Sequence, residues 1–257
     1  MANNPTRVDP IRSKYYRPLE RAELIAGWLF YLGAAFSLAP LFLDRQRNAT
    51  LYGVVLAISV LLVVSIFVLG VATRLYFAPR AADARRREFL SNAFGIDLTH
   101  DRTAGYYNND EVEPLPRVGM AVLENAFFST AILLAMLPRE RSRVAIYLAL
   151  WLFLAVWRDT PLDWIATSAQ VLFSEEIIAK WLRMESLRIR CEHVYQDVYR
   201  LYRSSPDAKT KAAMAVDAFG DYETAKAAGS ITLSSTLFEE LNPSLTEEWN
   251  KIRAALG

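Results

Sequence analysis

The sequence predicts an all-α membrane protein with about four transmembrane helices, a cytoplasmic helical domain and a homo-oligomeric state. The membrane part is predicted by two long apolar runs, residues 24–43 and residues 51–73. Neither run contains a formally charged side chain. An α-helix rises about 1.5 Å per residue, so a run of about 20 residues crosses a hydrocarbon layer about 30 Å thick. A third observation, an apolar stripe at helical spacing across residues 173–201, predicts a long amphipathic helix outside the membrane.

The first two apolar runs are separated only by residues 44–49, so they are expected to form an antiparallel hairpin. Lysine and arginine are concentrated on the outer flanks of this hairpin, with five such residues in 1–23 and five in 74–92. Basic residues are enriched on the cytoplasmic side of membrane spans. The amino terminus and residues 74–117 are therefore expected in the cytoplasm.

The second half of the chain predicts another hairpin. Residues 118–137 are apolar except for Glu124 and Asn125, and they fit a third span. Residues 138–143 contain a proline and three arginines, which predicts a tight turn. The next apolar stretch, residues 144–157, is too short to cross the membrane alone.

A helix start interrupts the fourth apolar stretch before it resumes at residues 164–173. Thr160 has the residue type of an N-cap, Pro161 suits the first helical position, and Asp163 places an acid in the first turn. Two interpretations stay open: a discontinuous fourth span, or a short span followed by a helix at the cytoplasmic surface. In the four-span arrangement the carboxyl terminus also lies in the cytoplasm.

These patterns divide the chain into five expected segments. They are a cytoplasmic amino-terminal segment (1–23), a transmembrane hairpin (24–78), a basic and aromatic cytoplasmic connector (79–117), a second transmembrane hairpin with a broken fourth helix (118–173) and a cytoplasmic helical domain (174–257).

The helix predicted across residues 173–201 has two adjacent apolar stripes. Two stripes present more apolar surface than one neighbouring helix covers, so the sequence predicts self-association through this helix. The expected interface residues are Trp181, Leu187, Val194 and Val198.

The residue inventory gives no basis for enzymatic chemistry. Cys191 is the single cysteine, and His100 and His193 lie far apart, so neither an internal disulfide nor metal-ligand spacing is expected. The sequence also has no nucleophile–base arrangement and no glycine-rich phosphate loop. We therefore expect a non-enzymatic protein that needs no cofactor.

Four ionisable residues within or beside apolar runs are candidate pore residues: Glu124, Arg158, Asp159 and Asp163. A charge that faces lipid is costly, so these side chains should face a protein interior or water. The alternative is that they pair with neighbours or cap a turn at the membrane surface, which requires no pore.

A basic and aromatic pattern in the connector predicts binding of single-stranded nucleic acid or a nucleotide. Arginine neutralises phosphate, and an aromatic ring stacks on a base. Anionic lipid headgroups are the alternative partner of the same arginines. The candidate ligand-binding residues are Arg85, Arg86, Arg87, Tyr106, Tyr107, Asn108, Arg188 and Arg190.

Three stretches, residues 89–99, 105–109 and 124–129, read FLSNAFGIDLT, GYYNN and ENAFFS. Here the chain resembles the small multi-span membrane effectors that accompany nucleotidyltransferases in bacterial anti-phage operons. The likeness is to the Hailong type, which is related to SMODS-associated multi-span effectors. The resemblance implies a homo-tetrameric channel in the bacterial inner membrane. It also implies that single-stranded DNA oligomers, made by a partner nucleotidyltransferase, hold the channel closed, whereas in related systems a cyclic nucleotide opens it.

The resulting hypothesis is a ligand-gated pore-forming effector, an ion channel whose opening depolarises the membrane and causes abortive infection. The rival hypothesis is a non-conducting, membrane-anchored scaffold or sensor whose cytoplasmic helices bind a protein partner. A third and weaker hypothesis is a transporter, because the sequence shows no inverted repeat.

Overall fold

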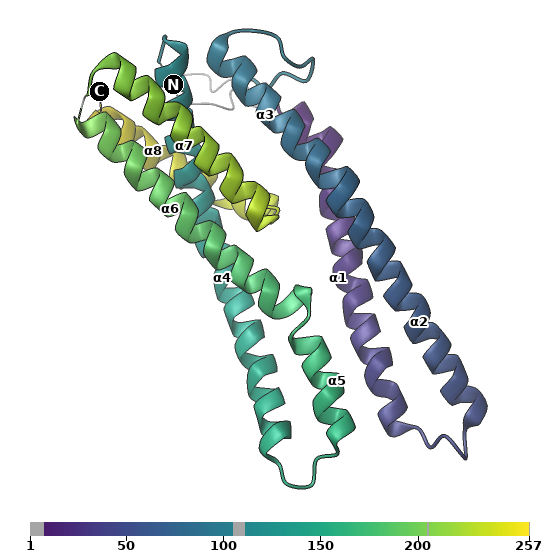
Figure 1. Cartoon of the computed structure of the whole chain (residues 1–257). Helices are drawn as coiled ribbons and strands as arrows, with labels where there is room; N and C mark the ends of the chain where they lie inside the picture. The colour runs from purple at the N-terminus through teal and green to yellow at the C-terminus, as the bar shows by residue number, and fades with distance from the viewer. Residues whose placement is uncertain (1–7, 105–110, 205, 257) are drawn as a thin grey trace. The chain divides into compact units, whose positions relative to one another are not determined.

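The computed structural model describes residues 8–104, 111–204 and 206–256, and these ranges are mostly helical (Figure 1). The predicted all-α class is confirmed for this part of the chain. The structure divides into two compact units that do not follow the chain order. The core unit comprises Met1–Arg12, Ala82–Pro138 and Leu182–Gly257, and the hairpin unit comprises Ser13–Ala81 and Arg139–Trp181.

The hairpin unit begins with the predicted antiparallel pair. Helix α1 (Arg17–Leu38) packs along α2 (Ala49–Ala72), and a 3₁₀ turn, η2 (Ala39–Phe42), precedes the linker (Figure 1). The pair is held closely, because the Ser59 hydroxyl donates a hydrogen bond to the Phe36 carbonyl at 3.2 Å. Most of the outward-facing side chains of both helices are apolar.

Three helical stretches are long and apolar enough to cross a membrane: Arg12–Phe42, Ala49–Phe94 and Pro114–Val156. In the first two, at most 6% of the most apolar window is buried inside the protein, whereas in the third 61% is buried. The first two stretches therefore leave their apolar surface for lipid to cover. The third buries most of its most apolar window against the rest of the chain, while its residues from Ile146 to Val156 are largely exposed.

Helix α4 (Pro114–Val156) corrects the predicted turn at residues 138–143, because it runs through this region without interruption. Pro138 lies inside the helix, where a proline removes one backbone hydrogen bond and kinks the axis. The charged residues that follow continue the helix, with Arg143 and Glu140 paired one turn apart at 3.2 Å. The sequence pattern mistook a charged helical segment for a loop.

The predicted interruption at residues 158–163 is confirmed as the connection between α4 and α5 (Leu162–Leu172). The helix starts one residue later than predicted, and Thr160 provides no cap hydrogen bond. Helix α5 ends at Leu172, Ser174 after it is extended with ψ 164°, and a π-helical segment, η4 (Glu175–Ala179), leads into α6 (Lys180–Ser204).

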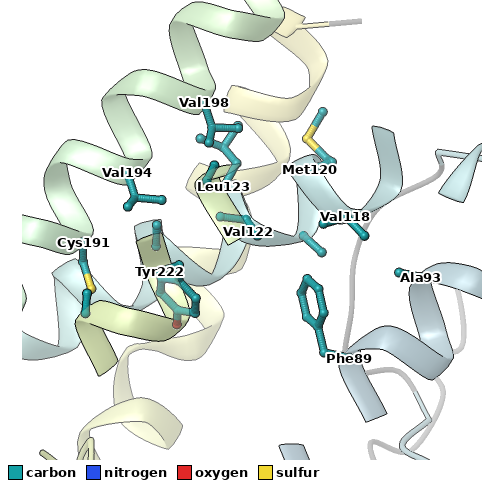
Figure 2. Packing of buried hydrophobic residues seen from close by; sticks show 14 of the residues in the cluster. Phe89, Ala93, Val118, Met120, Val122, Leu123, Cys191, Val194, Val198 and Tyr222 are labelled. Atoms are coloured by element: carbon teal, nitrogen blue, oxygen red, sulfur yellow. The ribbon is translucent and has the colours of Figure 1, made fainter. Parts of the chain in front are cut away.

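The core unit packs five helical segments around one apolar centre. They are α3 (Ala78–Phe94), the first half of α4, α6, α7 (Ala208–Gly229) and α8 (Ser235–Leu256). Figure 2 shows side chains of α3, α4, α6 and α7 meeting in this centre, and Trp249 of α8 is fully buried in the same cluster. Residues 118–137 thus pack with α6–α8. The expected segment 118–173 is therefore divided between the two units, although Pro114–Val156 is one of the three stretches long and apolar enough to cross a membrane.

The residues of the predicted subunit interface along α6 are mostly packed inside the monomer, and self-association through this helix stays a prediction. Leu187, Val194 and Val198 are only 3%, 7% and 0% exposed in the monomer, and all three belong to the core cluster. Trp181 is half-buried against a smaller cluster in the hairpin unit, around Val144. The apolar stripe of α6 is therefore occupied by intrachain partners, which the one-dimensional pattern could not distinguish from a second subunit.

Each passage of the chain between the two units lies at or near an irregular helix. These passages follow Arg12, Ala81, Pro138 and Trp181. The π-helical segment η1 (Arg12–Tyr16) contains the first passage, and η3 (Thr73–Phe77) and η4 lie just before the second and the fourth. Pro138 itself marks the third. Irregular turns of this kind often mark hinges in longer helices.

Gly119 of α4 predicts a sharp stability effect, because a Cβ there would lie 2.8 Å from the Tyr202 hydroxyl oxygen and 3.1 Å from the Ala215 Cβ. We expect Gly119→Ala to lower the free energy of unfolding by about 1–3 kcal/mol through overpacking. The matched control is Gly220→Ala in α7, where a Cβ meets nothing within 4 Å. That change should stabilise the helix by about 0.5–1 kcal/mol. Thermal unfolding followed by circular dichroism in detergent measures both, and equal shifts would contradict the described packing.

Candidate functional site

The candidate basic site begins on α3, where Arg85 is held by an ion pair within the core unit. Its Nη2 lies 2.7 Å from Oδ2 of Asp9, and the two side chains are only 14% and 13% exposed. A pair this well covered neutralises both charges and leaves little room for a ligand phosphate. Arg85 therefore fixes the amino-terminal segment to α3.

The next two arginines are more accessible. Arg87 pairs with Asp83 at 3.0 Å, and Arg86 forms an ion pair with the same carboxylate. Both guanidinium side chains are at least half exposed, so these pairs are surface pairs that contribute little and exchange readily. A phosphate could displace Asp83 from either arginine.

The α6 candidates lie on the same unit. Arg188 is flanked by Glu185 at 3.3 Å and Glu192 at 2.8 Å, whereas Arg190 is exposed and forms no ion pair with a described residue. Four of the five described candidates are therefore paired to carboxylates. The remaining three, Tyr106, Tyr107 and Asn108, lie outside the described residues.

A buried carboxylate that the sequence analysis missed anchors the connector next to these arginines. Glu88 is fully buried, and its Oε1 accepts hydrogen bonds from the Thr103 hydroxyl at 2.5 Å and the Thr103 backbone N–H at 3.3 Å. One residue further, Ala104 forms an antiparallel bridge with Val8. In the sequence, an acid that follows three arginines is typical of a solvent-exposed helix face. Only the fold shows that Glu88 is buried and binds Thr103.

The four candidate pore residues fall into different environments. Glu124 is 4% exposed and lies in α4 among the core cluster of the core unit. Arg158 and Asp159 are exposed in the connection between α4 and α5, and Asp163 is exposed in the first turn of α5, all in the hairpin unit. Glu124 thus belongs to a different unit from the other three, whose pore role stays a prediction.

Two arginines of the hairpin unit hold η4, the segment that follows α5. Arg74 of η3 forms an ion pair with Glu175, and Arg143 of α4 donates a hydrogen bond to the Glu176 carbonyl. The Arg143 guanidinium also lies 5.9 Å from the centre of the Tyr31 ring in α1. Segments from α1, η3 and α4 therefore converge on the exit from α5.

The single thiol is chemically protected. Cys191 of α6 is fully buried, and burial raises its pKa from 9.0 to about 12. Burial likewise raises the pKa of the Tyr202 hydroxyl, which donates a hydrogen bond to the Pro116 carbonyl. Neither group is poised for nucleophilic chemistry near neutral pH.

We predict that Cys191 resists iodoacetamide at pH 8 in the native protein and reacts after unfolding in denaturant, as measured by intact mass. The raised pKa also has a consequence for stability, since the native state keeps its proton longer than the unfolded state. This contribution is complete below pH 9 and is lost as the pH rises towards about 12. Native labelling at the unfolded rate would contradict the burial of this thiol.

No protein-family model matches the chain, and neither a curated protein nor a solved structure is significantly similar to it.

Proposed function

We propose that this protein is a homo-oligomeric membrane effector in which the hairpin unit forms an ion path and the core unit controls it through an anionic ligand. The observation that carries the proposal is the contrast between the two units. One is a helical bundle closed around an apolar centre, and the other exposes apolar side chains along most of its helices.

The exposed surface of the hairpin unit fits a lipid environment. On α2, for example, Val63 and Phe67 are 64% and 69% exposed, and Val156 at the end of α4 is 82% exposed. Soluble monomers rarely present continuous apolar surfaces of this extent to water. Lipid covers such surfaces without further protein contacts, so this unit is the one we place in the membrane.

The connections between the units support control of one by the other. The passages after Ala81, Pro138 and Trp181 lie inside helices, so no flexible loop interrupts the chain there. A helix transmits a displacement of one end to the other, and the π-helical segments and Pro138 offer points where such a helix bends. Binding at the core unit therefore has a mechanical route to the membrane segments.

The regulatory ligand in this proposal is a single-stranded DNA oligomer or a nucleotide, supplied by a partner nucleotidyltransferase and bound in the cytoplasm. Arg86, Arg87 and Arg190 are the exposed cations of the candidate site, and we assign them the contacts to phosphate. Arg85 is excluded from that role because Asp9 covers it. Glu124 is likewise left out of the ion path because it lies in the core unit.

Conduction is tested with the purified full-length chain in liposomes loaded with potassium and a membrane-potential dye. We expect ligand-free protein to dissipate an imposed potential, and expression without the ligand to depolarise and arrest bacterial cells. The inhibitory ligand should suppress both effects. If the protein neither conducts nor depolarises cells with or without single-stranded DNA or nucleotides, the non-conducting scaffold hypothesis replaces this one.

Ligand binding is tested by the salt dependence of affinity for a fluorescent single-stranded DNA. Each neutralised phosphate contributes about 0.7 to the slope of log affinity against log salt, so Arg86→Ala with Arg87→Ala should reduce the slope by about 1.4. The matched control removes two arginines from the linker between α1 and α2, Arg45→Ala with Arg47→Ala. An equal loss in both double variants would indicate general charge attraction rather than a site on α3.

A further inference from the structure

We propose that one face of α5 lines the ion path and selects cations; the inference rests on the function proposed above and deepens it. This polar face consists of Asp163, Ala166, Thr167 and Gln170. Successive residues of an α-helix are rotated by about 100°, so residues separated by three, four and seven positions share one side. Asp163, Ala166 and Gln170 are exposed there, and Thr167 is half-buried at its border.

The opposite side of α5 is fixed by aromatic and apolar contacts. The Trp164 ring packs edge-to-face on Phe42 at 4.8 Å between ring centres, and the Trp151 indole N–H donates a hydrogen bond to the Ile165 carbonyl at 3.3 Å. Leu172 is 1% exposed in the apolar cluster with Val144. These contacts set the rotation of α5, so its polar face points away from α1 and α4.

No other outward face of the hairpin unit has this character within the apolar stretches that the structure describes. The exposed residues of α4 from Ile146 to Val156 are all apolar, as are those of α2 from Leu51 to Val71. The α2 serines satisfy their own hydroxyls, because Ser59 and Ser65 donate to the carbonyls of Val55 and Leu61 at 2.9 and 2.8 Å. By contrast, the side chains of Asp163 and Gln170 have no hydrogen-bond or ion-pair partner among the described residues.

A lipid environment cannot satisfy this face. A carboxylate and an amide lose their water on entering hydrocarbon and must find other polar partners. Helix α5 is also too short to span a membrane, since its 11 residues rise about 16 Å, and an extended Ser174 separates it from the next helical segment. Interrupted helices at membrane depth are tolerated where they line a water-filled cavity.

From these observations we infer that water contacts the polar face. The water-filled path is enclosed by the α5 helices of several copies of the chain. Asp163 lies at the connection end of α5, and Gln170 lies two turns further along. A carboxylate repeated around such a path attracts cations and repels anions, and hydroxyl and amide oxygens offer partial replacement of a cation's hydration shell. The chemical class of the permeant ion is therefore a cation.

Cysteine accessibility tests this placement, because the native thiol is protected by burial. Gln170→Cys and Thr167→Cys are treated with a charged, membrane-impermeant methanethiosulfonate reagent in liposomes, and Leu150→Cys on the exposed apolar face of α4 is the control. We expect rapid labelling at residues 170 and 167, together with a several-fold change in the current. Labelling at residue 150 should be slow and leave the current unaltered.

The outcomes distinguish this inference from the proposed function. If wild-type protein conducts but residue 170 labels no faster than residue 150, α5 does not line the path. If residue 170 labels rapidly and the current does not change, α5 is a helix at the membrane surface, which also overturns the inference. If wild-type protein conducts under no condition, it is the proposed function that fails.

Selectivity provides a second readout. We expect Asp163→Asn to lower the permeability ratio of potassium over chloride several-fold, measured from the reversal potential in a salt gradient. The control is Asp44→Asn, which removes the same charge from the linker between α1 and α2 of the same unit. An unchanged ratio in Asp163→Asn, or an equal fall in both variants, would show that the polar face of α5 does not set selectivity.

Discussion

The packing of the first half of α4 against α6 and α7 is the interaction on which the rest of the molecule depends. Gly119 lets the Tyr202 ring of α6 and Ala215 of α7 approach the α4 backbone closely, and the hydroxyls of Ser129 and Tyr222 lie 2.9 Å apart in the interior. This packing buries most of the third apolar run against the rest of the core unit. The second half of the same helix lies in the hairpin unit, so α4 belongs to both units.

Much of the helical content follows from sequence periodicity. Periodicity does not show, however, whether an apolar helix packs against protein or faces lipid. The hairpin of α1 and α2 was predictable because residues 51–73 are apolar on every face, which only lipid tolerates. Residues 118–137 are also largely apolar, yet they pack against α6 and α7. Hydropathy reports the cost of water contact and gives no information on what replaces the water.

The candidate sites were only partly predictable, since long-range pairing determines which charges remain available. The run of three arginines is visible in the sequence, but Asp9, which neutralises Arg85, lies 76 residues away along the chain. Glu88 gains its role from Thr103 in the same way. On α5, by contrast, Asp163 and Gln170 share a face through local geometry alone. The sequence contains this spacing, but only the structure shows which side of α5 packs against other helices and which side is exposed.

The π-helical segments have a consequence for how movement would travel through the chain. A π-helical turn holds one more residue than an α-helical turn, so a segment that tightens to α-helix rotates everything beyond it by about 100°. At η4, which follows Phe173 and the extended Ser174 and continues into α6, such a change would turn α6 relative to the chain before η4 without breaking the helix. The response would come in whole-residue steps, which suits a switch with two settings better than one with graded positions.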